Sequence, residues 1–268
     1  MTRIRWQPVV ERAAQIVDEY DTGVTLRQCF YRLVADGTLS NTTNAYKALS
    51  SRTAEARRDG CFPDFVDNVR SIHRAQTFTS STQALFWLEN IYRRDRTEGQ
   101  DVSVYLGVEK RGIVAQLTDW FGDFGIPVLS LGGYSSQTYI DDVKADVSAS
   151  GRPAVLLYAG DFDPSGEDID RDFVARTGCF AKVVRIALTA EQVDAYNLPP
   201  QPGKAADSRA AAFVARHGEL VQVELDALPP DTLRQLYDDA LAEFWDTSVY
   251  EACLDREDID LAELEAPA

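Results

Sequence analysis

The stretch AVLLYAGDFDPSG, residues 154–166, determines the fold expected of this chain. Residues 154–158 are apolar, as in a strand that is buried on both faces of a parallel sheet. Pro164 cannot continue a strand ladder, and Gly166 permits a sharp turn. Asp161 and Asp163 therefore follow the carboxyl end of a buried strand, which is where open α/β sheets bind their ligands.

Asp161 and Asp163 suggest a metal site. Two carboxylates two residues apart repel each other unless a cation or a hydrogen-bond network neutralises them. Mg²⁺ is a common partner of such oxygen ligands. The alternative interpretation is a solvated turn that carries two exposed acids.

The composition is that of a folded protein. Hydrophobic residues form 45% and charged residues 26% of the 268 residues, which is enough for a packed core. No secretory leader is expected, and no stretch approaches the roughly 20 apolar residues of a membrane span. The four cysteines lack a metal-binding spacing, and two histidines are too few for a zinc site. We therefore expect a cytoplasmic protein with reduced, mostly buried thiols and no membrane contact.

The net charge of −16 is unevenly distributed. Residues 1–74 contain 11 basic and 9 acidic residues, whereas residues 231–268 contain 2 basic and 12 acidic ones. A mildly basic N-terminal part is compatible with binding to DNA, despite the acidic total.

Apolar side chains at helical spacing predict three helices near the N-terminus, over residues 7–19, 26–35 and 44–58. Two closely spaced helices and a basic third one suggest a helix-turn-helix or winged-helix module, with residues 61–69 as the wing. A fourth helix is expected over residues 82–92, within a first domain that ends at residue 98.

Basic side chains of this module are candidates for contacts with DNA phosphates. The third predicted helix carries Arg52, Arg57 and Arg58, and Arg70 and Arg74 add positive charge beyond it. If the module is not of the winged-helix kind, these side chains form a solvated face.

Tyr31 has an unusual place on the second predicted helix. The apolar stripe of that helix consists of Leu26, Cys29, Phe30, Leu33 and Val34. Tyr31 lies roughly 130° from the centre of this stripe, and Arg27 precedes it by one turn. Because other residues fill the apolar face, we expect Tyr31 off the buried face, with its hydroxyl accessible in a groove. A packed aromatic is the ordinary alternative.

The second half of the chain alternates strands and helices. Strands are expected over residues 102–108, 127–131, 154–158 and 182–186, with helices between them over residues 113–124, 137–149 and 167–177. This order predicts an α/β domain, residues 99–268, in which a parallel sheet has helices on both faces.

The C-terminal part is expected to begin with a loop before regular structure resumes. Residues 198–203 are rich in proline and predict a loop, followed by a short strand at 221–225. A helix is expected over residues 231–254, and the acidic residues from Asp255 onward are expected to fray.

Glu109 adds a third carboxylate to the predicted site. It follows the strand 102–108, so we expect it at the same edge of the sheet as Asp161 and Asp163. Lys110 either contacts a phosphate or is an ordinary surface lysine. Glu224 is a further acid that could approach the metal.

Two turns near this edge have two interpretations each. Ser135 and Ser136 end a glycine-rich turn and either bind a phosphate or cap the helix that follows. Glu167 and Asp168 are expected to favour the N-terminus of a helix rather than to bind metal.

Several of these residues also carry a family resemblance. Val108-Glu109-Lys110 and Asp161-Phe162-Asp163-Pro164-Ser165-Gly166 resemble the Toprim domain of topoisomerases, primases and certain nucleases. The D-x-D-P-x-G form is most similar to the A subunit of topoisomerase VI. Arg27-Gln28-Cys29-Phe30-Tyr31 resembles the R-x-x-[YF]-Y motif of that family, whose last tyrosine attacks DNA. Residues 221–228 resemble its K-x-E-x-x-A-L segment, although Val221 or Gln222 stands where the family has lysine.

The resemblance, closest to the compact relatives called Mini-A, implies an Mg²⁺-dependent enzyme that cleaves DNA. Tyr31 would attack a phosphodiester and leave a phosphotyrosyl link and a free 3′-hydroxyl. Arg27 would stabilise charge in the transition state, and Glu109, Asp161 and Asp163 would hold Mg²⁺. In such proteins the tyrosine of one subunit works with the metal site of the other, which implies a homodimer. An ATPase or another partner subunit is compatible with the resemblance.

Two other functions remain open. The protein could be a Toprim nuclease of the defence or anti-plasmid type, which uses water while Tyr31 is structural. It could also be a DNA-binding subunit that cleaves only with a partner.

Overall fold

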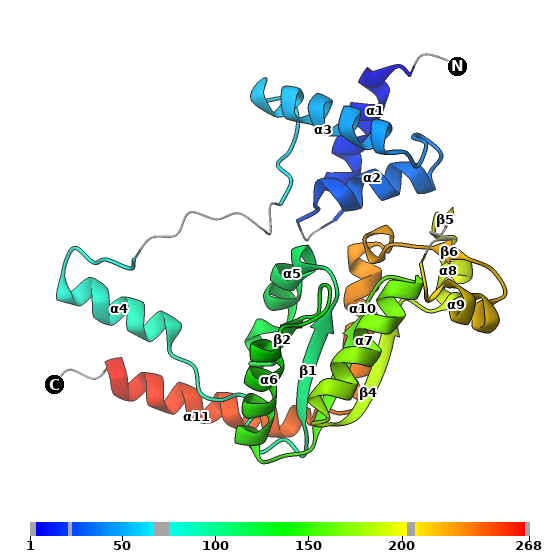
Figure 1. Cartoon of the computed structure of the whole chain (residues 1–268). Coiled ribbons are helices and arrows are strands. Elements are labelled where there is room, and N and C mark those ends of the chain that lie inside the picture. Colours follow the sequence, from blue (N-terminus) through cyan, green and yellow to red (C-terminus); the bar gives the residue numbers. More distant parts are fainter. Residues whose placement is uncertain (1–3, 21–22, 67–74, 203–206, 266–268) are drawn as a thin grey trace.

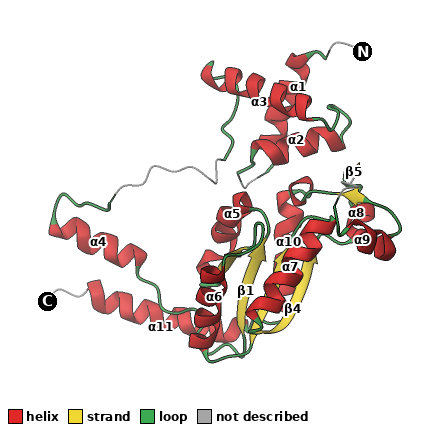
Figure 2. Cartoon of the chain, viewed as in Figure 1, coloured by secondary structure: helices red, strands yellow, loops and turns green. Residues whose placement is uncertain are grey.

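The computed structural model describes residues 4–20, 23–66, 75–202 and 207–265. A helical N-terminal part lies at one end of a parallel sheet that helices cover on both faces (Figures 1 and 2). The predicted mixed α/β fold, with a parallel sheet between helices, is therefore confirmed.

The N-terminal part contains helices α1 (Trp6–Asp18), α2 (Leu26–Ala35) and α3 (Thr43–Arg58). A capping box begins α2, because the Thr25 hydroxyl accepts from the Gln28 amide while the Gln28 side chain accepts from the Thr25 amide. Residues 61–66 form no strand, so that part of the predicted wing is wrong. Residues 67–69, Arg70 and Arg74 lie outside the described residues.

The sheet contains β1 (Ser103–Val108), β2 (Val128–Ser130), β3 (Ala154–Ala159) and β4 (Phe180–Ala187) in the order β2-β1-β3-β4. All three pairings are parallel, and the register aligns Val108 with Ala159. The central strands β1 and β3 are buried along their whole length, as the apolar runs predicted. Their carboxyl ends therefore lie side by side at one edge.

Alternate side chains of β1 and β3 pack into two cores. One core joins the sheet to α5 (Arg111–Phe121) and α10 (Pro230–Ala242). The other joins it to α6 (Gln137–Ser150) and α7 (Pro164–Thr177). The first core continues into α1, α2 and α3, so the two halves of the chain share buried apolar surface.

Segments after β4 contain more structure than predicted. Helices α8 (Ala190–Ala195) and α9 (Ala210–His217) were missed, and the predicted loop contains β5 (Gln201–Pro202), which pairs with β6 (Val221–Gln222). The predicted helix 231–254 is wrong as a single element. It is broken between α10 and α11 (Thr247–Glu265), because Asp246 accepts hydrogen bonds from the Ser248 and Val249 amides and begins a new helix.

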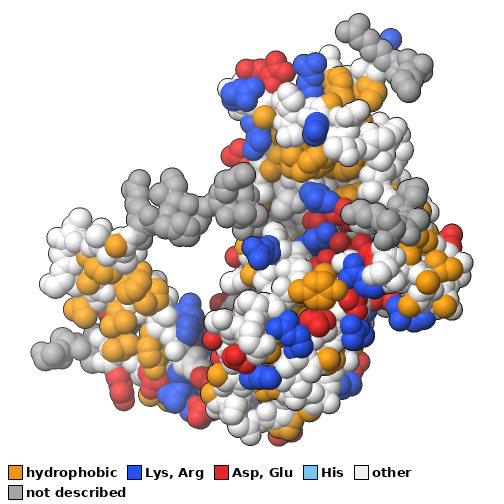
Figure 3. Space-filling view, in the orientation of Figure 1, with side chains coloured by type: hydrophobic (Ala, Val, Ile, Leu, Met, Phe, Trp, Pro, Cys, Tyr) orange, Lys and Arg blue, Asp and Glu red, His pale blue; other side chains and the backbone are white. Residues whose placement is uncertain are grey.

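The predicted fraying from Asp255 is also wrong, because α11 packs beside α4 (Ser81–Ile91), apart from the sheet (Figure 1). Asp260 accepts from the Tyr92 hydroxyl and pairs with Arg94, each at 2.6 Å. Glu257 pairs with Arg96 at 2.5 Å. Apolar side chains gather on the surface of α4 (Figure 3), namely Leu85, Phe86, Trp87, Leu88 and Ile91.

The thiols differ in burial more than expected. Cys29 and Cys253 are buried, Cys179 is half-buried and Cys61 is exposed, all as free thiols. Among the described residues, no helix combines the length and the apolar character needed to cross a membrane.

The contact between Glu257 and Arg96 yields a test of the fold. The Glu257 carboxylate also accepts from the Arg94 amide at 2.8 Å, and its side chain is only 5% exposed. Glu257→Gln should lower the free energy of unfolding by roughly 2 kcal/mol, because it leaves the largely buried Arg96 with only the exposed Asp123, at 3.7 Å, as a charged partner. Urea denaturation measures this change, with the exposed Glu263→Gln as control. Equal losses in the two variants would contradict a structural role for this ion pair.

Candidate functional site

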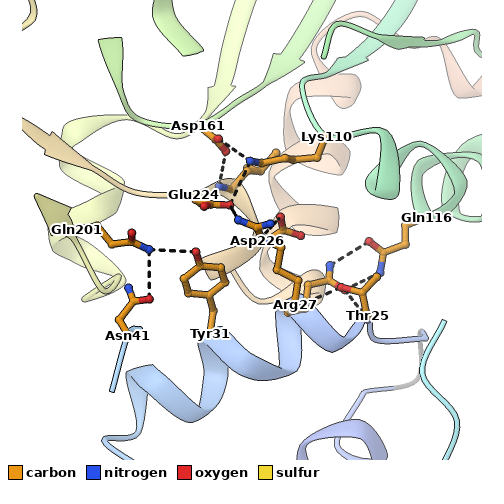
Figure 4. Close-up of polar contacts among 12 residues, drawn as sticks. Thr25, Arg27, Tyr31, Asn41, Lys110, Gln116, Asp161, Gln201, Glu224 and Asp226 are labelled. Atoms are coloured by element: carbon orange, nitrogen blue, oxygen red, sulfur yellow. Dashed lines mark hydrogen bonds and ion pairs between the residues drawn. The ribbon is translucent and has the colours of Figure 1, made fainter. Parts of the chain in front are cut away.

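A cluster of acids lies at the carboxyl edge of the sheet (Figure 4). Glu109 directly follows β1, and Asp161 follows β3 after one glycine. A Glu109 side-chain oxygen accepts from the Asp161 amide at 2.8 Å, so the two residues are in contact. The sequence predicted this neighbourhood from the parallel order of the strands.

A later segment brings two further acids to the same edge. Phe162 and Val223 exchange backbone hydrogen bonds of 2.9 and 3.0 Å, which ties residues 221–228 to the end of β3. The Leu225 amide then donates to Asp161 at 2.8 Å. Glu224 and Asp226, on either side of Leu225, therefore join Asp161 in what we call the acidic cluster: Glu109, Asp161, Asp163, Glu224 and Asp226.

Asp163 has a helix-capping contact within this cluster. Its carboxylate accepts from the Gly166 amide at 2.7 Å and caps α7. Gly166 is needed there, because a β-carbon would collide with the Asp161 carbonyl and lie 3.1 Å from the Glu109 carboxylate. Among the described residues, no group of three or more His, Cys, Asp or Glu side chains is arranged to hold a metal ion.

Burial is the main influence on the ionisation of Glu109, Asp161 and Asp226. Burial, followed by repulsion from Asp161, raises the pKa of Glu109 to about 7. Burial raises the pKa of Asp226 to about 6, and burial also raises that of Asp161. Burial opposes ionisation of Glu224 too, but the positive charges of Lys110 and Arg27 outweigh it and lower the pKa of Glu224.

Two basic side chains partly neutralise the acidic cluster. Lys110 Nζ lies 2.6 Å from Asp161 Oδ2 and 3.2 Å from Glu224 Oε2. Arg27, from α2, pairs with Glu224 and lies 3.5 Å from Asp226. Lys110 is thus not an ordinary surface lysine, and Arg27 links the N-terminal helices to the edge of the sheet.

Tyr31 lies next to this link, but it is buried. The residue is only 3% exposed, so the prediction that it lies off the buried face with an accessible hydroxyl is wrong. The reason is that α2 has a second buried face: it packs against α1 and α3 on one side and against η2 (Leu225–Ala227) on the other. The Tyr31 hydroxyl accepts from Gln201 Nε2 at 3.2 Å and contacts no main-chain carbonyl among the described residues.

The predicted basic contacts of α3 lie away from the acidic cluster. Arg52 pairs with Glu55 at 3.2 Å, and Arg58 is exposed. The Arg57 guanidinium lies over the ring of Phe65, 5.4 Å from its centre. Arg57 therefore also contributes to packing, which the sequence did not indicate.

The serines and the first turn of α7 have structural contacts. The Ser136 hydroxyl accepts from the Tyr139 amide at 3.2 Å and caps α6, and the Ser135 carbonyl accepts from Arg176 at 2.7 Å. Glu167 pairs with Arg216 and His217, and Asp168 accepts from the Tyr134 hydroxyl at 2.5 Å. The capping interpretation of Ser136 is thus confirmed.

Sequence reasoning missed three residues of the site. Asp226 is buried in the acidic cluster, and Asn41 and Gln201 lie beside Tyr31 (Figure 4). Asp226 lies two residues after Glu224 in the segment 221–228, and this acid-x-acid spacing, like that of Asp161 and Asp163, could have identified it. Asn41 and Gln201 are placed by long-range packing, for which local sequence has no signal.

No protein-family description matches this chain, and no curated protein sequence matches it significantly.

The raised pKa of Glu109 gives a pH test. As the pH rises from 4.5 to about 7, the unfolded chain releases this proton before the folded protein does, so the free energy of unfolding falls. Glu109→Gln cannot ionise and should lose roughly 2 kcal/mol less stability than wild type between pH 4.5 and 8. Urea denaturation at several pH values, without divalent cations, measures this, and the exposed Glu219→Gln is the control. An unchanged pH slope in Glu109→Gln would contradict the raised pKa of Glu109 in the folded protein.

Proposed function

We propose that the protein is an Mg²⁺-dependent DNA-cleaving enzyme similar to the A subunit of topoisomerase VI, with Tyr31 as nucleophile. The observation that carries this proposal is the ion pair between Arg27 and Glu224. It joins the R-x-x-F-Y segment to the acidic cluster of the same chain, so the proposed site lies within one subunit, unlike the two-subunit site that the resemblance implies. Transesterification of a phosphodiester needs a nucleophile, a positive charge and a metal site, and here a tyrosine, an arginine and several acids lie close together.

The donor set fits Mg²⁺. The acidic cluster has five carboxylates, and within the described part of the chain its ion pairs are with two basic side chains, Lys110 and Arg27. The raised pKa of Glu109 also reflects repulsion that a cation would relieve. Glu109, Asp161 and Asp163 would hold the ion, which when bound supplies Lewis-acid stabilisation of the phosphate charge. Lys110, released from Asp161, would then be available to contact a DNA phosphate.

In the proposed reaction, the Tyr31 oxygen forms a bond to phosphorus while the bond from phosphorus to the 3′ oxygen breaks. The phenolic proton is lost, and the leaving 3′ oxygen takes up a proton. Arg27 would stabilise the negative charge that develops on the phosphate. The outcome is a DNA strand joined to Tyr31 through its 5′ phosphate, with a free 3′-hydroxyl on the other side.

The described arrangement corresponds to a resting state in this proposal. Burial, followed by the negative charge of Glu224, raises the pKa of Tyr31 to about 12, so the phenol stays protonated at neutral pH. Glu224 is a weak proton acceptor, because Lys110 and Arg27 hold its pKa low. Activation therefore requires that the phenol become less buried and that Glu224 move away or lose its charge when DNA and Mg²⁺ bind.

The burial of Tyr31 favours a second candidate function. A residue that is 3% exposed and hydrogen-bonded to Gln201 is also what a structural tyrosine would look like. In that case the same acids would serve a nuclease that uses water as nucleophile. The two functions differ in their products, because only the first produces a covalent protein–DNA adduct.

Substitution of Tyr31 by phenylalanine separates these functions. The ring and its packing remain, so Tyr31→Phe should fold with a loss of at most about 1 kcal/mol from the missing hydrogen bond. With end-labelled DNA and Mg²⁺, wild type and the exposed control Tyr196→Phe should form a covalent adduct, and Tyr31→Phe should neither form it nor cleave. Continued cleavage by Tyr31→Phe to free 5′-phosphate ends would establish the water-using nuclease instead.

DNA binding by α3 gives a separate prediction. Arg52 and Arg58 are exposed, and removing both avoids the packing contact of Arg57. Arg52→Ala/Arg58→Ala should weaken DNA binding and reduce the slope of log affinity against log salt by about 2, or roughly 1 per lost phosphate contact. Arg234→Ala/Arg256→Ala removes two exposed arginines from the C-terminal helices and serves as charge-matched control. Equal slopes for the two double variants would exclude α3 as the DNA-facing helix.

A further inference from the structure

A cavity of about 350 Å³ lies beside Tyr31, between α2, the N-terminal end of α3 and β5. This volume is near the lower end of the range for pockets that hold small ligands, and it suits a single planar ring system. The acidic cluster borders it through Glu224, and Arg27 also lines it. The cavity is therefore next to the proposed nucleophile but is not needed to hold the metal.

Aromatic rings form one wall of the cavity. The ring of Phe30 lies 5.4 Å from that of Tyr31 and 5.3 Å from that of Tyr46, centre to centre, and all three residues line the cavity. Such rings provide surfaces on which a nucleobase can stack, whatever its identity. Arg27 lies 6.0 Å from the ring centre of Tyr31 and adds a positive charge at the same wall.

Side-chain amides form the opposite wall. Gln201 Nε2 donates to both the Tyr31 hydroxyl and Asn41 Oδ1, each at 3.2 Å, so the two amides face each other beside the phenol (Figure 4). The Asn41 side-chain nitrogen is buried and has no hydrogen-bond partner among the described residues. A buried donor without an acceptor is unfavourable, and an acceptor on a ligand in the cavity would satisfy it.

We propose that this cavity binds one unpaired nucleobase of the DNA, belonging to a nucleotide beside the phosphodiester that Tyr31 attacks. This assignment rests on the proposed function. The aromatic wall stacks on the base, and Asn41 donates to an acceptor on the base edge, as asparagine does when it reads bases. The base has to be unpaired, because the cavity admits one ring system and a base inside a duplex is covered by its partner and its neighbours.

Fluorescence of 2-aminopurine tests this assignment without any cleavage. A short oligonucleotide of abasic nucleotides with one central 2-aminopurine is titrated with protein in the presence of EDTA, and the same oligonucleotide with an abasic nucleotide in place of the 2-aminopurine serves as competitor. We expect fluorescence quenching as the base stacks on the aromatic wall, and about tenfold weaker binding of the abasic oligonucleotide. The same titration is made with Asn41→Ala, with Tyr46→Leu and with the control Asn44→Ala, an exposed asparagine outside the cavity.

Asn44→Ala should behave as wild type, Asn41→Ala should bind the 2-aminopurine oligonucleotide about tenfold more weakly, and Tyr46→Leu should lose most of the quenching. Circular dichroism checks that each variant is folded; if Tyr46→Leu is not, Asn41→Ala decides alone. Equal binding of the abasic and intact oligonucleotides, or no binding of either, would overturn the assignment. Base-dependent binding without any cleavage in Mg²⁺ would contradict the proposed function alone, whereas cleavage with base-independent binding would contradict the cavity alone.

Discussion

The contact of Lys110 with Asp161 and Glu224 is the interaction on which the rest of the site depends. Five carboxylates meet at one edge of the sheet, and Lys110 and Arg27 are the basic side chains paired with them in the described part of the chain. Lys110 comes from the end of β1 and Arg27 from α2, so charge neutralisation and the docking of the N-terminal helices are coupled. Removal of either cation would leave buried negative charge uncompensated.

In the proposed function, the same constraint holds the site in a resting arrangement. Burial, followed by the negative charge of Glu224 that attracts Arg27, raises the pKa of the neighbouring phenol of Tyr31. A cation bound among Glu109, Asp161 and Asp163 would compete with Lys110 for Asp161 and so weaken the whole set of ion pairs. In the proposed function, metal and DNA would thus act on one network rather than at two independent places.

Much of the fold could be predicted from the sequence, because periodicity reports directly on burial. The strand 154–158, the four parallel strands and the junction of Glu109 with Asp161 follow from apolar runs and from chain order. Tyr31 was misplaced because a helical wheel assumes one buried face, whereas α2 is packed on two sides. The last part of α11, from Asp255, was expected to fray because its ion pairs are with Arg94 and Arg96, about 160 residues earlier in the chain. The proposed roles of the R-x-x-F-Y and D-x-D-P-x-G segments in DNA cleavage rest on the family resemblance.

The most direct test of the central claim is a crystal structure of the full chain grown with Mn²⁺, which occupies Mg²⁺ sites and is located by its anomalous scattering. We expect one anomalous peak among the carboxylates of Glu109, Asp161 and Asp163, with Lys110 Nζ displaced from its 2.6 Å contact with Asp161. A crystal in which Lys110 keeps that contact at saturating Mn²⁺, with no peak at these carboxylates, would show that Lys110 is the permanent partner of Asp161 and would contradict a metal-dependent site.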